Sequence, residues 1–145
     1  MFKVNYNIRK GKYSNLDDVD DMFLRYDFLE GNVMLNSDRA SINIDWDIPL
    51  LDFAVSMRII SFKLNAKNEC DQSFDFTESA AEIRFKRTEN DLTISTTFSD
   101  EMIKTKYDEF ANAVETFYNE VTNKISVEYP ELITNKSYQK ILMLP

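Results

Sequence analysis

The sequence predicts one α+β domain over residues 1–145, in which an antiparallel sheet of about seven strands is covered on one face by two helices. Several segments alternate apolar and polar residues with the two-residue period of a strand. Two other segments space their apolar residues three and four apart, as a helix does. Short turns separate most of the strands, which favours antiparallel pairing. The expected order is therefore ββββ-α-βββ-α.

The first part of the chain predicts an antiparallel meander. Phe2, Val4, Tyr6 and Ile8 alternate with polar residues, and a polar loop follows over residues 10–21. Alternation resumes at Met22, and the pairs Gly31–Asn32 and Ser37–Asp38 are typical of turns. The four predicted strands are residues 2–9, 22–29, 33–35 and 42–46.

A helix is predicted next, over residues 48–64. Pro49 suits its first turn, where the missing backbone N–H costs nothing. The segment is apolar on most sides and has only a narrow polar strip that includes Asp52. A helix of this kind is expected to be buried against the sheet.

The second half predicts three more strands, near residues 74–76, 81–85 and 92–98, with a turn at residues 89–91. Ser99 is the predicted N-cap of a long helix that Pro130 ends, followed by a short docking helix in residues 131–145. The apolar stripe of the long helix fits a coiled-coil seam or core packing, and core packing is favoured. It comprises Ile103, Tyr107, Phe110, Val114, Phe117, Val121 and Ile125.

The composition argues against the commonest enzyme classes. The chain has no histidine, two glycines and one cysteine, Cys70. Histidine-based catalysis, glycine-rich phosphate loops, thiolate metal cages and an intrachain disulfide are therefore not expected. We expect no cofactor, no metal site and no enzymatic activity.

Charge and hydropathy narrow the range of partners. Acidic residues outnumber basic residues by 25 to 17, which gives a net charge of −8. Nucleic acids and anionic membranes would be repelled, whereas a basic protein would be attracted. The sequence predicts neither a signal peptide nor a membrane span, so the cytoplasm is the expected location.

The densest charge lies in the loop that contains Asp17, Asp18, Asp20 and Asp21. The spacing lacks the glycine and the closing glutamate of an EF-hand, which argues against a calcium site. The remaining alternatives are a solvated loop and a docking patch for a basic partner.

A second candidate is the segment Asp45–Trp46–Asp47, which holds the only tryptophan. Trp46 is in phase with Ile42 and Ile44, so core packing is the favoured role and a surface hot spot is the alternative. Asp45 and Asp47 are expected on the opposite, solvated face, where both could contact a partner, although Asp47 could also cap the following helix.

Two enzymatic alternatives receive little support from the residues. Asp27, Asp45, Asp75 and Glu82 are polar-face strand positions, but their spacing selects no catalytic pair. Cys70, expected in the loop at residues 65–71, stands between two acidic residues that disfavour a reactive thiolate.

The chain resembles the small acidic immunity proteins of bacterial toxin–immunity systems. The resemblance consists of the overall plan, the acidic balance and the run from Ile42 to Phe53, where a strand passes directly into a helix. It implies a protein that binds and neutralises one cognate, basic toxin domain, such as a nuclease. The expected partner-binding residues are Asp17, Asp18, Asp20, Asp21, Asp45 and Asp47. The alternative is a structural or regulatory subunit of a homo-oligomer that acts through its long helix.

Overall fold

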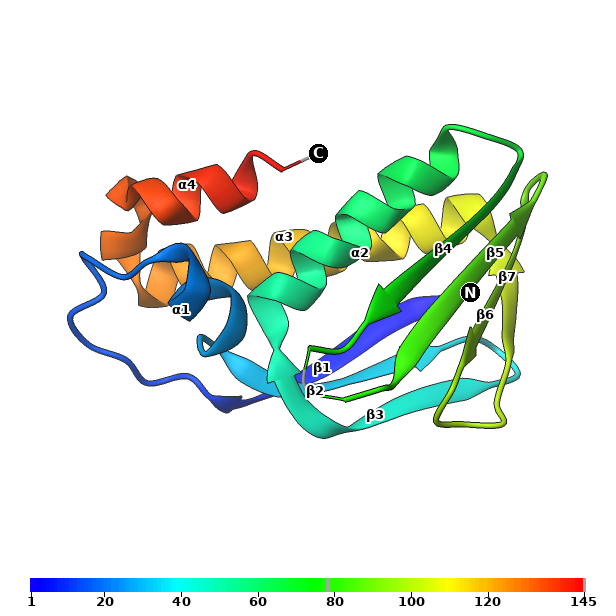
Figure 1. Ribbon diagram of the computed structural model, residues 1–145, viewed down its shortest axis with the longest axis horizontal. Helices are drawn as coiled ribbons and strands as arrows, with labels where there is room; N and C mark the ends of the chain where they lie inside the picture. Colours follow the sequence, from blue (N-terminus) through cyan, green and yellow to red (C-terminus); the bar gives the residue numbers. More distant parts are fainter. Residues whose placement is uncertain (78, 145) are drawn as a thin grey trace.

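The computed structural model describes residues 1–77 and 79–144, and its architecture is α+β, with two antiparallel sheets and four α-helices (Figure 1). The first sheet has the strand order β1-β2-β3 and the second β4-β5-β6-β7. The elements are β1 (Lys3–Lys10), α1 (Asp21–Tyr26), β2 (Glu30–Asn36), β3 (Ser41–Pro49), α2 (Leu50–Asn65), β4 (Glu69–Asp75), β5 (Glu82–Thr88), β6 (Asp91–Thr96), β7 (Ile103–Lys106), α3 (Tyr107–Glu128), the 3-10 helix η1 (Pro130–Thr134) and α4 (Lys136–Leu142).

The two sheets are separate, which corrects the expectation of one continuous sheet. Within each sheet, alternate residues point into the core, as the two-residue period requires. In the first sheet Val4 pairs with Leu35, which pairs with Ile42. In the second sheet Phe85 pairs with Ile94, and both are buried.

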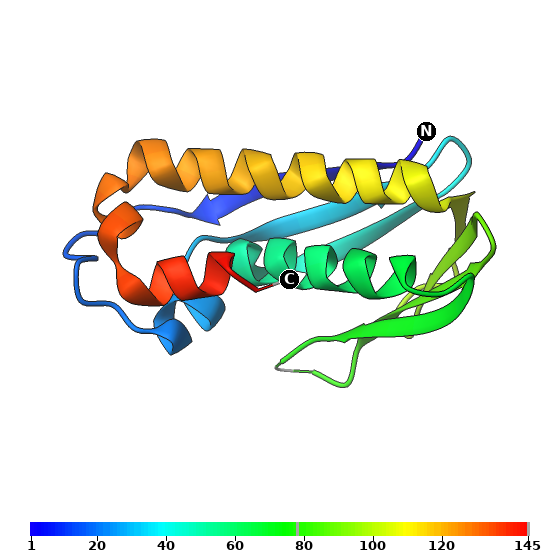
Figure 2. The ribbon, with the colours of Figure 1, turned by 90° about the horizontal axis from the view of Figure 1, so that it is seen from above.

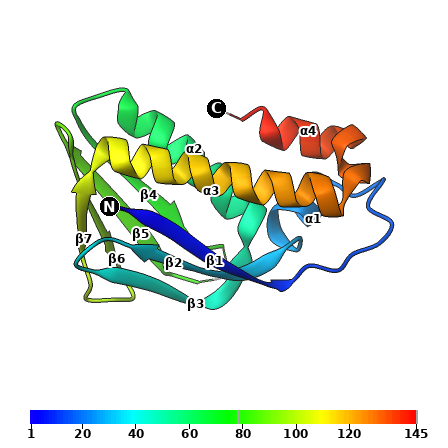
Figure 3. The ribbon, with the colours of Figure 1, turned by 180° about the vertical axis from the view of Figure 1, so that it is seen from behind.

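Helices α2 and α3 lie side by side over the sheets (Figure 2), and β1 runs beneath α3 (Figure 3). Phe53 of α2 joins the layers, because its ring lies 5.1 Å from Phe74 of β4 and 6.0 Å from Phe117 of α3. From Tyr107 onward the apolar stripe of α3 is buried, which confirms its predicted role in the core. The same helices thus cover both sheets and form one core.

Residues 22–29 contain helix α1, and the prediction of a strand there is wrong. Asp20 caps this helix by accepting a hydrogen bond from the backbone N–H of Phe23 at 3.0 Å. Leu24 and Phe28 are fully buried, whereas Met22 is 68% exposed. Leu24 is the buried residue of α1, and Phe28 is buried beyond the end of the helix; the apparent alternation came from counting exposed Met22 and Tyr26 as core residues.

The long helix begins later than predicted, at Tyr107, and Ser99 does not cap it. Residues 103–106 form strand β7, in which Ile103 pairs with Ile94 and is fully buried. Ile103 precedes Tyr107 by four residues, so its burial in the sheet imitates a helical stripe. For this reason the sequence pattern did not reveal β7, the fourth strand of the second sheet.

The predicted loop at residues 65–71 is also shorter than expected, because β4 begins at Glu69 and places Cys70 in a strand. Near the C-terminus, α4 docks through Tyr138 and Ile141, as predicted. Among the residues that the structure describes, no helix is both long and apolar enough to cross a membrane.

Candidate functional site around Trp46

The acidic loop lies beside α1, and its aspartates have different roles. Asp17, Asp18 and Asp20 are exposed, and Asp21 is half-buried in the first turn of α1. Asp20 is partly engaged as the N-cap of that helix. Within residues 1–77 and 79–144, no ion pair involves any of these carboxylates. Asp17 and Asp18 therefore present negative charge without an ion-pair partner in this part of the chain, whereas Asp20 is held at the N-terminus of α1 and Asp21 lies near Arg25.

The buried side chain of Asn135 fixes the backbone of this loop. Its amide nitrogen lies within hydrogen-bond distance of the carbonyl oxygens of Leu16, Asp17 and Val19, at 3.4, 3.0 and 3.1 Å. Its side-chain oxygen accepts a hydrogen bond from the backbone N–H of Tyr138 at 2.9 Å. Asn135 thus caps α4 and positions the acidic loop at once.

Asp45 and Asp47 flank Trp46 in an irregular part of β3. Val33 pairs with Ile44 and Gly31 pairs with Ile48, so residues 45–47 stand opposite Asn32 alone. Such a bulge re-aims side chains. Both aspartates are exposed, as predicted, and Pro49 rather than Asp47 is the N-cap residue of α2.

Trp46 is not buried, which corrects its favoured assignment to the core. The ring packs edge-on against Phe76, after β4, and Phe98, after β6, at centroid distances of 5.1 and 5.0 Å. It remains 36% exposed. Trp46 therefore lies at the seam between the two sheets and keeps part of its ring available to a partner.

A small hollow of about 230 Å³ opens on one side of Trp46. Three carboxylates line it: Glu30, Asp47 and Asp52. No basic side chain is among its described lining residues, which also include Tyr26, Ile48, Pro49, Phe74, Phe76, Thr77 and Ser79. The described lining is therefore aromatic and acidic.

Each of these carboxylates has a cationic neighbour that does not line the hollow. Arg9 Nε lies 3.6 Å from Asp47 Oδ1, and Lys10 Nζ lies 3.4 Å from Glu30 Oε2. Both bases are well exposed, with 58% and 71% of the side-chain surface accessible. Exposed pairs of this kind contribute little to stability.

Asp52 differs from the other two because it is buried in the first turn of α2. Its Oδ1 accepts a hydrogen bond from Arg25 Nε at 2.8 Å. Burial raises the pKa of Asp52, and Arg25 offsets this only in part. Burial alone would lower the pKa of Arg25, but the hydrogen bond and charge of Asp52 raise it. The ion pair with Arg25 therefore offsets only part of the free-energy cost of removing the Asp52 carboxylate from water.

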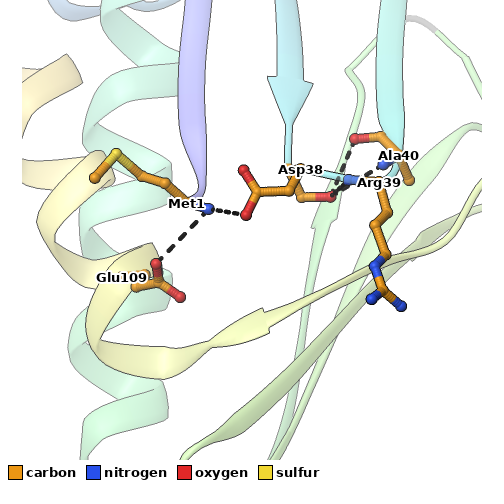
Figure 4. A network of polar contacts seen from close by, with 6 residues as sticks. Met1, Asp38, Arg39, Ala40 and Glu109 are labelled. Carbon is orange, nitrogen blue, oxygen red and sulfur yellow. Dashed lines mark hydrogen bonds and ion pairs between the residues drawn. The ribbon is translucent and has the colours of Figure 1, made fainter.

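A larger, shallower hollow of about 700 Å³ lies on the other side of Trp46. Asp45, Asp38 and Glu101 contribute carboxylates to it, and Arg39 is the base among its described lining residues. Asp38 contacts the N-terminal amine of Met1 at 2.6 Å, and Glu109 of α3 lies 3.9 Å from the same amine (Figure 4). Asp38 is thereby partly neutralised, whereas no ion pair to Asp45 or Glu101 occurs in the described part of the chain.

The six predicted partner-binding aspartates fall into two groups. Asp45 and Asp47 border Trp46 from opposite sides, whereas none of the acidic-loop residues lines either hollow. Sequence reasoning missed Glu30, Asp52 and Tyr26 as lining residues. The signal available in the sequence was Asp52, an acidic residue in the first turn of an otherwise apolar helix.

Comparison with known proteins does not assign the chain: no family model, curated protein or solved structure matches it. In the described ranges, no group of three or more cysteine and acidic side chains is arranged to hold a metal ion.

Proposed function

We propose that this chain is a non-enzymatic immunity protein that binds and neutralises a cognate, basic toxin domain. The observation that carries the proposal is Trp46, a partly exposed tryptophan at the seam of two sheets with an acid-lined hollow on each side. Tryptophan is enriched among the residues that dominate binding energy. Because its ring is held by Phe76 and Phe98, little side-chain freedom remains to be lost on binding.

The net charge of −8 supports a basic partner. Opposite charge accelerates encounter, and unpaired acids near the contact direct the partner to it. The acidic loop is suited to this steering role, since Asp17 and Asp18 have no ion-pair partner in the described part of the chain and its backbone is fixed by Asn135. We place the chain in the cytoplasm, where a lone cysteine such as Cys70 stays reduced.

An acid–base enzyme is the competing reading of the small hollow, since three carboxylates line it. Each of them already pairs with Arg9, Lys10 or Arg25. Only the pair of Asp52 with Arg25 is both short and partly buried, and a carboxylate held in this way is poorly suited to carry a proton to a substrate. This pairing favours binding over catalysis.

The alternative function, a subunit of a homo-oligomer, requires that the long helix present a free apolar face to a second copy. The stripe of α3 is already used in the core, where Phe110, Val114 and Phe117 are each 1% exposed. What α3 leaves outside is mostly polar, with Val127 as its exposed apolar residue. The helix thus offers no continuous apolar face to a second copy.

Co-expression tests the proposal. The chain is produced in bacteria together with the toxin domain encoded beside its own gene, and growth is measured. We expect the wild type to protect the cells and to form a complex with the domain, and Trp46→Ala to lose protection. Phe62→Ala is the matched control, because Phe62 is an exposed aromatic residue of α2 that lines neither hollow. Failure to bind, or full protection by Trp46→Ala, would refute the proposal.

A further inference from the structure

We propose that the small hollow beside Trp46 is an anchor pocket for a single arginine side chain of the partner. The inference rests on the proposed function only for the identity of the protein that supplies the arginine. The affinity of the pocket for a guanidinium group is a property of this chain and can be measured without that protein.

The walls of the hollow have the chemistry that recognises an organic cation. Trp46, 36% exposed, offers an aromatic ring, whereas Arg25 Cζ already lies 6.0 Å from the centroid of the Tyr26 ring; Phe74 and Phe76 also line the hollow. Cations bind over aromatic faces, most strongly over tryptophan. Carboxylates from β2, β3 and α2 converge on the same space.

The resident bases leave room for an incoming cation. Arg9 and Lys10 approach Asp47 and Glu30 from outside the hollow and are mostly exposed. Breaking such exposed pairs costs little, and both side chains remain solvated when they move away. Arg25 stays with Asp52, because that contact is shorter and half-buried.

Size and shape favour arginine over a larger ligand or lysine. A volume of about 230 Å³ is below the ~300 Å³ at which drug-sized ligand pockets begin, so it suits one side chain. A planar guanidinium can stack on Trp46 while its N–H groups fork onto a carboxylate such as Asp47. A lysine ammonium is a compact charge that can neither stack as a plane nor donate in a bidentate fork.

The single tryptophan gives the chain one indole N–H signal, which reports on the two hollows that border Trp46, and the variants below distinguish the two. The probe is the peptide acetyl-Gly-Arg-Gly-amide, titrated while the ¹H–¹⁵N indole signal of Trp46 is followed by NMR. Acetyl-Gly-citrulline-Gly-amide is the neutral, nearly isosteric control. We expect a saturable shift with the arginine peptide, with a Kd on the order of 1 mM for a single anchor, and no saturation with citrulline.

Two variants with the same charge change locate the binding. Asp47→Asn alters the hollow and is expected to weaken the arginine peptide about tenfold, the size of one charge-assisted hydrogen bond. Asp45→Asn removes the same charge from the other side of Trp46 and is expected to change Kd less than about twofold, because Asp45 does not line the small hollow and an exposed charge without a hydrogen bond to the ligand is weakened by water and salt. Circular dichroism establishes that both variants are folded.

Equal shifts with arginine and citrulline, no shift with arginine, or equal weakening by the two variants would overturn the anchor pocket. Those outcomes leave the proposed function open, because complex formation with the toxin domain is measured separately. Conversely, a pocket that binds arginine while the toxin domain fails to bind would refute the immunity function alone.

Discussion

The hydroxyl of Tyr138 is buried and makes no hydrogen bond of ordinary geometry within the described part of the chain, and the nearby Ser126 side chain only slightly offsets the effect of burial on the Tyr138 pKa. A buried hydroxyl without a hydrogen-bond partner lowers the free energy of unfolding, and phenylalanine, which has no hydroxyl, avoids this cost. We expect Tyr138→Phe to increase the free energy of unfolding by about 1 kcal/mol, as measured by urea denaturation. Tyr26→Phe, at an exposed tyrosine, should leave it unchanged, and a destabilised Tyr138→Phe would show that the hydroxyl is satisfied.

Ionisation of Tyr138 is expected to lower the free energy of unfolding in alkaline solution. Burial raises the pKa of Tyr138 to about 12 from the ordinary value of 10.0. The folded state therefore holds this proton more tightly than the unfolded state does. The associated stability is complete below pH 10 and is lost as the pH rises toward 12. The free energy of unfolding should fall more steeply over this interval in the wild type than in Tyr138→Phe, and identical slopes would contradict the assignment.

Buried Asp52 pairs with half-buried Arg25, and this pair is costly to break by removing Arg25 alone. Arg25→Met leaves a buried carboxylate unpaired, and we expect it to lower the free energy of unfolding by about 3 kcal/mol. The double variant Arg25→Met/Asp52→Leu removes both charges and should recover most of that loss. Lys106→Met is the control, because its pair with Asp91 is exposed and its loss should lower the free energy of unfolding far less. Additive effects in the double variant would contradict the pairing.

At the scale of elements, Asn135 connects α4 to the acidic loop. We expect Asn135→Ala to lower the free energy of unfolding by about 2 kcal/mol, because three carbonyl contacts and a helix cap are lost together. Amide hydrogen exchange at residues 16–20 should accelerate more than exchange in β5. The exposed Asn123→Ala is the control, and equal acceleration in both regions would show that Asn135 does not hold the loop.

Element types were predictable from the sequence wherever burial and periodicity agreed. Strand β1 alternates half-buried and exposed residues, and α2 is buried on most sides, as their patterns indicated. The prediction of element type failed where the same apolar residues fit both the period of a strand and the period of a helix. Leu24 and Phe28 are buried in the phase of a strand, yet Leu24 lies in α1, which Asp20 caps, and Phe28 lies beyond its end. Ile103 likewise continues the helical stripe while it lies in β7.

The site could be predicted only in part, for a related reason. The exposure of Asp45 and Asp47 followed from alternation along β3. The exposure of Trp46 did not, because it depends on a bulge opposite Asn32 and on contacts with Phe76 and Phe98, which come from the other sheet. The pattern of residues within one strand does not indicate which distant segment of the chain will pack against it.

At the scale of the whole molecule, Trp46 links the two sheets, and α2 and α3 cover both. We therefore expect the sheets to unfold together. Tryptophan fluorescence, which reports on the seam, and far-ultraviolet circular dichroism should give coincident urea transitions. Separate midpoints would show that the second sheet unfolds independently.

The central claim is that a basic partner is drawn to the acidic surface around Trp46, and the association rate constant with the toxin domain tests it most directly. We expect this constant to fall as sodium chloride rises, and to be lower at low salt for Asp45→Asn/Asp47→Asn. Glu120→Gln/Glu128→Gln, which changes the net charge equally on α3, should match the wild type closely. A rate constant that is independent of salt, or that falls equally in both variants, would contradict the account.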